Sequence, residues 1–217
     1  MKRLLTILLS FLFISFQSVK ADNIGVGITG AMHSIDISGT ETTRNSGQKN
    51  NGSHTEEIAI AEFFIEKTYD NGFAMGVSYI PTRDMGAKSR SDTNSEGDTG
   101  TYKAEAELDN VVQIYFDAPI VDVFGSNLYA KFGLQHARIT TLESLNSGST
   151  YPNEDVHGLT LGLGAKGDLP YGSLYYKLEG TYTEFSDYEE TAASGGGNQV
   201  TASLEDTALK LSLGYKF

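Results

Sequence analysis

Strict alternation of large apolar residues with small or charged ones is the feature of this sequence that most constrains its fold. The last ten residues, ALKLSLGYKF (208–217), place five large apolar side chains on one strand face: Leu209, Leu211, Leu213, Tyr215 and Phe217. Because successive strand side chains point to opposite faces, the other face carries only small residues and lysines. Such a strand separates two environments, either core and water in a soluble sandwich or lipid and lumen in a membrane barrel.

Seven further segments upstream repeat this alternation. The clearest are 101–116 (TYKAEAELDNVVQIYF) and 157–166 (HGLTLGLGAK), where large apolar residues alternate with acids or with glycines. A helix would spread the acids of 101–116 around its circumference, so the strand interpretation is favoured. The other five segments are 23–37, 55–69, 73–81, 128–138 and 173–185. Together with the C-terminal segment, they predict eight strands.

The N-terminal residues, MKRLLTILLSFLFISFQSVKA, form a separate unit. Lys2 and Arg3 precede an apolar run over 4–16, and Ala21 supplies the small residue of a cleavage site. This is the pattern of a secretory signal peptide, and the run is shorter than the roughly 20 residues that a spanning helix needs. The sequence therefore predicts a signal peptide over 1–21 and one β-barrel domain over 22–217.

Composition excludes several classes of protein. The chain contains no cysteine, so disulfides are impossible. Its net charge is −12, and removal of the predicted signal peptide makes it −15, which is unfavourable for binding nucleic acid. Beyond residue 21 no apolar run approaches the length of a spanning helix. A mature protein of this sequence that lives in a membrane must therefore be a barrel, the other structure that satisfies every backbone group in lipid.

The predicted connections alternate in length along the chain. Four are long and polar, and the three between them are shorter. The long ones are 38–54, 82–100, 140–156 and 186–200, and the shorter ones are 70–72, 118–127 and 167–172. Long loops on one side and short turns on the other are typical of outer-membrane barrels. An even number of strands also returns both ends of the mature chain to the periplasmic side.

The signal peptide, eight alternating segments, four long polar connections and the ending LKLSLGYKF together resemble the small eight-stranded outer-membrane proteins of Gram-negative bacteria, of the opacity-protein and OmpA-barrel type. The resemblance covers 22–217 and is one of pattern. It implies a transmembrane, antiparallel, up-and-down barrel in the bacterial outer membrane, among lipid and lipopolysaccharide. It also implies that the barrel-assembly machinery reads an assembly signal formed by Leu209, Leu211, Leu213, Tyr215 and Phe217, and that periplasmic chaperones are partners during biogenesis.

Charged residues of both signs fall on the faces that are predicted to point into the barrel. These residues are Glu62, Glu66, Lys103, Glu105, Glu107, Asp109, Lys131, Lys166, Lys177, Glu179, Lys210 and Lys216. They either line an ion-selective pore or fill the lumen as pairs of opposite charge. Because an eight-stranded barrel has little interior space and an unpaired buried charge is costly, a plugged lumen is favoured.

In two segments, large apolar residues lie close in sequence to these inward charges. On 101–116, the alternation leaves Leu108 on the lipid face while its neighbours Glu107 and Asp109 face the lumen. On 55–69, the inward glutamates bring three large apolar residues, Ile58, Ile60 and Phe64, to the lumen as well. The orientation of this second segment is therefore ambiguous from the sequence.

Catalytic and metal sites are not predicted. His33 and Ser34 are adjacent in a strand, so their side chains point to opposite faces and do not form a base–nucleophile pair. His136 and His157 lie near strand ends and are interpreted as membrane-interface residues. The segment 92–103 has the acidic spacing of an EF-hand loop, but a lysine replaces its final glutamate. We therefore expect no cofactor.

The sequence thus favours an integral outer-membrane protein with a structural or surface-exposed role and no enzymatic activity. One alternative is a narrow channel for ions or small solutes. A third interpretation is an adhesin or receptor that binds an extracellular ligand through its loops, and the sequence does not identify that ligand.

Overall fold

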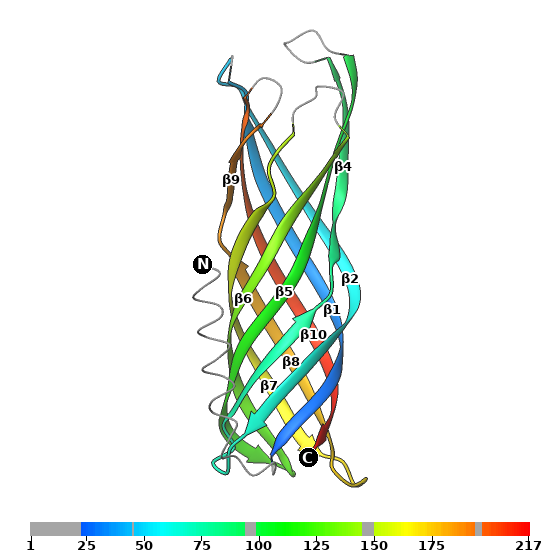
Figure 1. Cartoon of the computed structure of the whole chain (residues 1–217), viewed down its shortest axis with the longest axis vertical. Coiled ribbons are helices and arrows are strands. Elements are labelled where there is room, and N and C mark those ends of the chain that lie inside the picture. The colour runs from blue at the N-terminus through cyan, green and yellow to red at the C-terminus, as the bar shows by residue number, and fades with distance from the viewer. Residues whose placement is uncertain (1–22, 45, 94–98, 145–149, 194–196) are drawn as a thin grey trace.

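The computed structural model describes residues 23–44, 46–93, 99–144, 150–193 and 197–217, and these form an all-β barrel (Figure 1). The predicted signal peptide, 1–21, lies outside them. No helix among the described residues is long and apolar enough to cross a membrane. The strands are β1 (Ile24–Thr42), β2 (Lys49–Thr68), β3 (Ala74–Ile80), β4 (Arg83–Thr93), β5 (Thr99–Val123), β6 (Ser126–Ser144), β7 (Glu154–Asp168), β8 (Leu174–Phe185), β9 (Tyr188–Thr191) and β10 (Gln199–Lys216).

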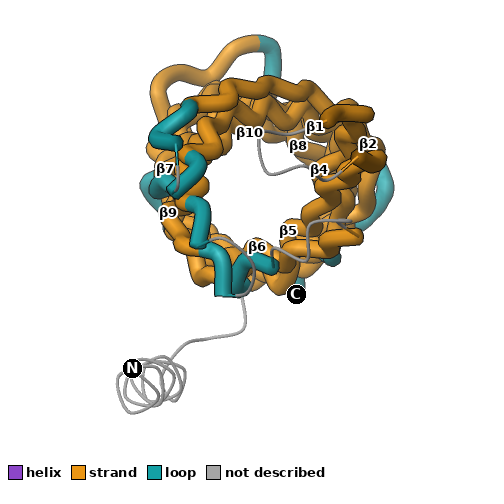
Figure 2. Tube along the Cα trace, turned by 90° about the horizontal axis from the view of Figure 1, so that it is seen from above, coloured by secondary structure: helices purple, strands orange, loops and turns teal. Residues whose placement is uncertain are grey.

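These ten strands form one closed antiparallel ring with eight wall positions. β3 and β4 both pair with β5 and continue one another, and β8 and β9 both pair with β10 in the same way. The ring closes where residues 25–42 of β1 pair with residues 199–216 of β10. Seen from above, the strands encircle a single axis (Figure 2). The predicted eight-stranded up-and-down barrel, closed by its C-terminal strand, is confirmed.

Large apolar side chains cover the outside of the lower half of the barrel, the half that holds the C-terminus in Figure 1. The most central of them are more than half exposed, for example Leu161 at 54% and Leu211 at 62%. On β1 this band runs from Ile24 to Met32, which matches the roughly 9–11 residues of a membrane-spanning strand. A continuous exposed apolar surface of this kind is the lipid-facing surface of a transmembrane barrel.

Above the band, the strands exchange the polarity of their two faces. On β1, Val26 and Ile28 point outward in the lower half, whereas Ile35 is fully buried inside the upper half. The upper interior holds a hydrophobic core formed by Ile35, Ile80, Met85, Leu108, Val111, Ala137, Ile139, Val156, Phe185, Tyr188 and Leu204. Outward residues at this height are acidic and exposed, for example Asp36, Glu184 and Glu205. The upper half is therefore built like a water-soluble barrel, with a core inside and charges outside.

One strand achieves this exchange through a β-bulge. The register of β5 against β6 shifts between Asp109 and Val112, and Asn110 takes a positive φ of 52°. Leu108 and Val111 are both completely buried in the upper core, whereas Val112 is 40% exposed on the lipid face. The bulge thus reverses which residues point inward on its two sides.

Because of this bulge, the prediction that the charged residues of 101–109 face the lumen is wrong for the acids. Glu105, Glu107 and Asp109 lie on the outer face rather than in the lumen, because Leu108 and Ala106 point inward and join the upper core. The prediction from the alternation requires lipid outside the whole strand. Above the lipid-facing band, however, the outer environment is water. A carboxylate is stable there on the outside and costly on the inside.

Strands also extend into the long polar connections expected from the sequence. The expected connection 38–54 contains the upper ends of β1 and β2, and only residues 43–48 lie between these strands. The expected connection 82–100 contains β4, and 186–200 contains β9. The composition of these stretches predicts loops because most of their side chains are polar, and two of them contribute an inward residue, Met85 or Tyr188, to the upper core.

Among the described residues, β2 has a hydrogen-bonded neighbour strand on both of its edges only in the lower half of the barrel. β2 pairs with β3 through Phe63–Thr68, and this ladder ends shortly before Pro81, which directly follows β3. Proline has no N–H to donate, so it interrupts a ladder at its own position. Within the described residues, β4 forms a ladder with β5 alone. The upper part of β2 therefore has one paired edge, toward β1, and one edge without a ladder.

Candidate functional site

Among the described residues, ten acidic or basic side chains, histidine included, converge in the lumen, and each is at most 6% exposed. Six were placed there from the sequence, and the structure also buries them: Glu62, Glu66, Lys131, Lys177, Glu179 and Lys210. The other four, which sequence reasoning missed, are His33, Arg83, Asp117 and Asp206. The strands bring them together because each presents every second residue to the interior.

Three lysines and three carboxylates form the lower charge cluster: Lys131, Lys166, Lys177, Glu66, Asp117 and Glu179. Lys177 Nζ lies 2.9 Å from Glu66 Oε2 and 2.8 Å from Asp117 Oδ2. Lys131 Nζ lies 2.8 Å from Asp117 Oδ1 and 2.9 Å from Glu179 Oε1. Lys166 Nζ donates a hydrogen bond of 2.5 Å to Glu66 Oε1. Because cations and anions are equal in number and interleaved, the lower charge cluster is neutral.

Tyrosine rings pack tightly around the lower charge cluster. The hydroxyl of Tyr115 donates to Glu66 Oε2 at 2.9 Å, and Lys131 Nζ lies 3.6 Å from the centroid of the Tyr115 ring. Tyr175 is 1% exposed, and its ring lies where a Cβ on Gly214 would be. A glycine is needed there to let the ring reach the wall. The aromatic rings therefore occupy lumen volume that a water-filled path would need.

The upper charge cluster consists of His33, Glu62, Arg83, Asp206 and Lys210. Lys210 Nζ donates to both oxygens of Glu62, at 2.8 and 2.9 Å. Arg83 Nη2 lies 2.9 Å from Asp206 Oδ2. His33 lies between the two carboxylates, with Nε2 at 2.9 Å from Glu62 Oε1 and Nδ1 at 2.9 Å from Asp206 Oδ2.

His33 Nδ1 has close neighbours of opposite character. Arg83 Nη1 lies 2.7 Å from it, and Asp206 Oδ1 and Oδ2 lie 3.0 and 2.9 Å from it. A guanidinium can only donate and an ionised carboxylate can only accept, so the tautomer of His33 decides which of these contacts is its hydrogen bond. Two basic side chains, Lys210 and Arg83, pair with two carboxylates, Glu62 and Asp206, so the upper charge cluster also combines opposite charges.

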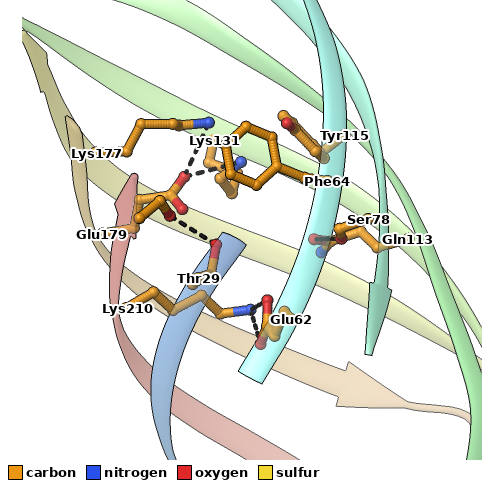
Figure 3. Close-up of a pocket in the computed structure, with 11 residues that line it drawn as sticks. Thr29, Glu62, Phe64, Ser78, Gln113, Tyr115, Lys131, Lys177, Glu179 and Lys210 are labelled. Carbon is orange, nitrogen blue, oxygen red and sulfur yellow. Dashed lines mark hydrogen bonds and ion pairs between the residues drawn. The ribbon is translucent and has the colours of Figure 1, made fainter. Parts of the chain in front are cut away.

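A layer of uncharged polar side chains lies across the barrel from the upper charge cluster. Gln113 Nε2 donates to Thr160 Oγ1 at 2.9 Å, and Gln135 Nε2 donates to the same oxygen at 3.0 Å. Between the two charge clusters is a cavity of about 20 Å³, lined by residues that include Glu62, Lys210 and Lys131 (Figure 3). This volume holds about one water molecule. The site is thus a packed charge network, without room here for a hydrated ion.

The remaining residues that were assigned to the lumen lie elsewhere or only partly inside. Lys166 is partly buried in the lower charge cluster, and Lys216 lies at the lower rim, where it pairs with Asp168. Glu105, Glu107 and Asp109 face outward, as described above. The side chain of Lys103 and the middle of 92–103 lie outside the described part of the chain.

The five residues of the expected assembly signal lie on the lipid face of the closing strand. Their exposed fractions range from 46% for Tyr215 to 62% for Leu211 and Phe217. The backbone N–H of Phe217 donates to the carbonyl of Ile24, and the N–H of Asn23 donates to the carbonyl of Phe217. Both described ends of the chain therefore meet at the lower rim of the barrel.

Comparison with known proteins supports the fold rather than a particular activity. No protein-family model matches the sequence, and no curated protein matches it. Among solved structures, the outer membrane protein OprG from Pseudomonas aeruginosa is similar with a TM-score of 0.58 and 13% identity, over 90% of this chain and 97% of OprG.

Two further solved structures show weaker similarity. Neisserial surface protein A matches with a TM-score of 0.47 and 8% identity, over 87% of this chain and 97% of its own. The outer membrane protease OmpT from Escherichia coli matches with a TM-score of 0.46 and 12% identity, over 93% of this chain and 99% of its own. The fold of this chain is that of a bacterial outer-membrane β-barrel such as OprG, and at this level of identity the similarity concerns the fold alone.

Proposed function

We propose that this chain is an integral protein of the bacterial outer membrane, with a closed lumen and a structural or surface-exposed role rather than an enzymatic one. The observation that carries the proposal is the layered filling of the interior. Clusters of paired opposite charges fill the lumen below a hydrophobic core. A barrel filled in this way stabilises itself and leaves its outer surfaces free to interact.

The proposed orientation places both ends of the mature chain in the periplasm and the upper half outside the cell. It is supported by the shared position of residues 23 and 217 at the lower rim, where the chain is joined by short turns. The acidic outer wall of the upper half would then face the medium, among the sugars and phosphates of lipopolysaccharide. An extracellular ligand, if the protein has one, would meet this wall.

Planar-bilayer recordings of the refolded chain test the closed lumen. We expect a folded barrel, recognised by a mobility shift on heating, that shows no steady conductance beside an open porin recorded in the same bilayers. The physical reason is the lack of space for a hydrated ion between the charge clusters. Steady openings that change when Glu62 or Lys210 is neutralised would instead support the channel alternative.

The assembly signal is proposed to act through the outward row of the last strand. The terminal Phe217 is 62% exposed and contributes its ring to no interior contact of the lumen clusters. We expect deletion of Phe217 to reduce the heat-modifiable, folded form in cells by several-fold while leaving refolding in detergent nearly unchanged. A matched Phe124→Ala variant, at an exposed turn, should assemble normally. Equal loss in cells and in detergent would show that Phe217 acts on stability alone.

A further inference from the structure

Two histidines stand side by side on the outer surface at the upper edge of the lipid-facing band. His136 of β6 and His157 of β7 are direct cross-strand partners, and both are exposed. Their ring centroids are 5.2 Å apart, with an angle of 37° between the ring planes. The pair directly below is Leu134 and Leu159, which face lipid. The imidazoles therefore sit where the lipid surface ends and water begins.

We propose that His136 and His157 form a two-imidazole site for a divalent transition-metal ion such as Zn²⁺. Imidazole nitrogen binds zinc at about 2.0–2.1 Å, which places each ring centroid about 3.2 Å from the metal. At a tetrahedral angle, two such centroids lie about 5.2 Å apart. The centroid separation in this barrel equals that value.

The strand geometry prepares this arrangement at low cost. Directly opposite residues of neighbouring antiparallel strands project in parallel from the same face, so both rings extend away from the wall together. The backbone of both strands is held by the ladder on either side of the pair, from Ser126 to Ile139 on β6. Binding would therefore restrict two short side chains and leave the wall unchanged.

The type of ligand determines which cation the pair selects. Charges of both signs lie just above the pair, where Arg138 of β6 is the cross-strand partner of Asp155 on β7 and of Asp109 on β5. Imidazole nitrogens select zinc, copper or nickel over calcium or magnesium, which need oxygen ligands.

Water would complete the coordination. Among the described residues, no group of three or more histidine, cysteine, aspartate or glutamate side chains is arranged as a metal site. With two protein ligands the metal keeps open positions, which distinguishes this site from a closed structural zinc site. The site would hold zinc reversibly at the level of the outer-leaflet headgroups.

Zinc titration of the refolded, untagged full barrel in detergent micelles tests the proposal. A chromogenic zinc indicator serves as competitor near neutral pH. We expect about one zinc ion per chain, and a loss of affinity of roughly 100-fold when either histidine is replaced by alanine, because each replacement abolishes chelation. The double variant should bind no more weakly than either single variant.

The matched control is His54→Ala. His54 lies on another hairpin beside Glu56, at 3.1 Å, and makes no contact with the proposed pair. This variant should bind zinc like the parent, and the heat-induced mobility shift confirms that every variant is folded. Small, additive losses in the single variants, a parent that binds no tighter than the double variant, or loss of binding in His54→Ala would each overturn the proposal. Lowering the pH should also release the metal, because zinc binds only neutral imidazole.

Discussion

Replacing Lys177 with methionine should lower the free energy of unfolding by about 3–5 kcal/mol, the usual cost of removing one partner from a buried ion pair. Lys177 is 2% exposed and contacts both Glu66 and Asp117 within 3 Å. Methionine has a similar length but no charge, so the lower charge cluster would keep three carboxylates against two lysines. The unbalanced carboxylate stays buried, since Glu66 is 2% exposed and lies against Tyr115.

Equilibrium unfolding in urea, followed by the heat-modifiable mobility of the folded form, measures this change. The control is Lys49→Met, at an exposed position on the upper hairpin, which should stay within about 0.5 kcal/mol of the parent. Adding Glu66→Gln to Lys177→Met should recover part of the loss, since it restores equal numbers of charges. If Lys177→Met unfolds like the control, or if the second change adds its own full cost, the lower charge cluster is not the paired network described above.

Leu108→Ala and Glu107→Ala are expected to have very different effects although the residues are neighbours. Leu108 is completely buried in the upper core, and truncating a buried leucine to alanine costs about 2–5 kcal/mol. Glu107 faces outward into water, so its replacement should change stability by about 0.5 kcal/mol or less. The contrast is a direct test of the bulge at Asn110.

The same urea titration resolves the two variants, and limited proteolysis locates the change. Leu108→Ala should expose the upper half to protease before the membrane-spanning half, because the cavity forms in the upper core. A larger cost for Glu107→Ala than for Leu108→Ala would mean that the alternation continues without a bulge and that the acids of β5 point inward after all.

The lower half of the barrel was predictable from the sequence because lipid outside it requires large apolar residues to face outward and small or charged residues to face inward. Leu159, Leu161 and Leu163 alternate with glycine and threonine, and the structure places all three leucines on the lipid face. The inward charges of this half followed from the same rule. Lys177 and Glu179, for example, could be placed by counting from outward Leu178.

The predicted strand ends and orientations in the upper half were partly wrong. Water replaces lipid outside this half, so apolar residues face inward and polar residues face outward. Arg83 lies in a polar stretch whose composition predicts a connection, and Asp206 lies before the predicted start of the last strand. Both are buried in the upper charge cluster. A signal was nevertheless present, since the apolar positions of 55–69 change from even numbers, at Ile58 and Ile60, to odd numbers, at Phe63.

The remaining error had no such signal. On β5 the bulge at Asn110 lets Leu108 and Val112 keep the same numbering parity while facing opposite environments. Asparagine tolerates the positive φ that the bulge needs, but one asparagine in a strand does not by itself predict a bulge. Register irregularities of this kind depend on the neighbouring strand, which a single sequence does not reveal.

The residues at which the outward face changes from apolar to polar also mark one level along the barrel axis. On β1 the change falls between Met32 and Ile35, and on β10 it falls between their cross-strand partners Leu209 and Asp206, so neighbouring strands carry the change at the same level. Strands without a bulge, such as β1 and β10, therefore allow a related or redesigned sequence to be positioned along the membrane normal. Residues added in pairs on one side of this level lengthen the lipid-facing part, and on the other side the water-facing part, without mixing the two.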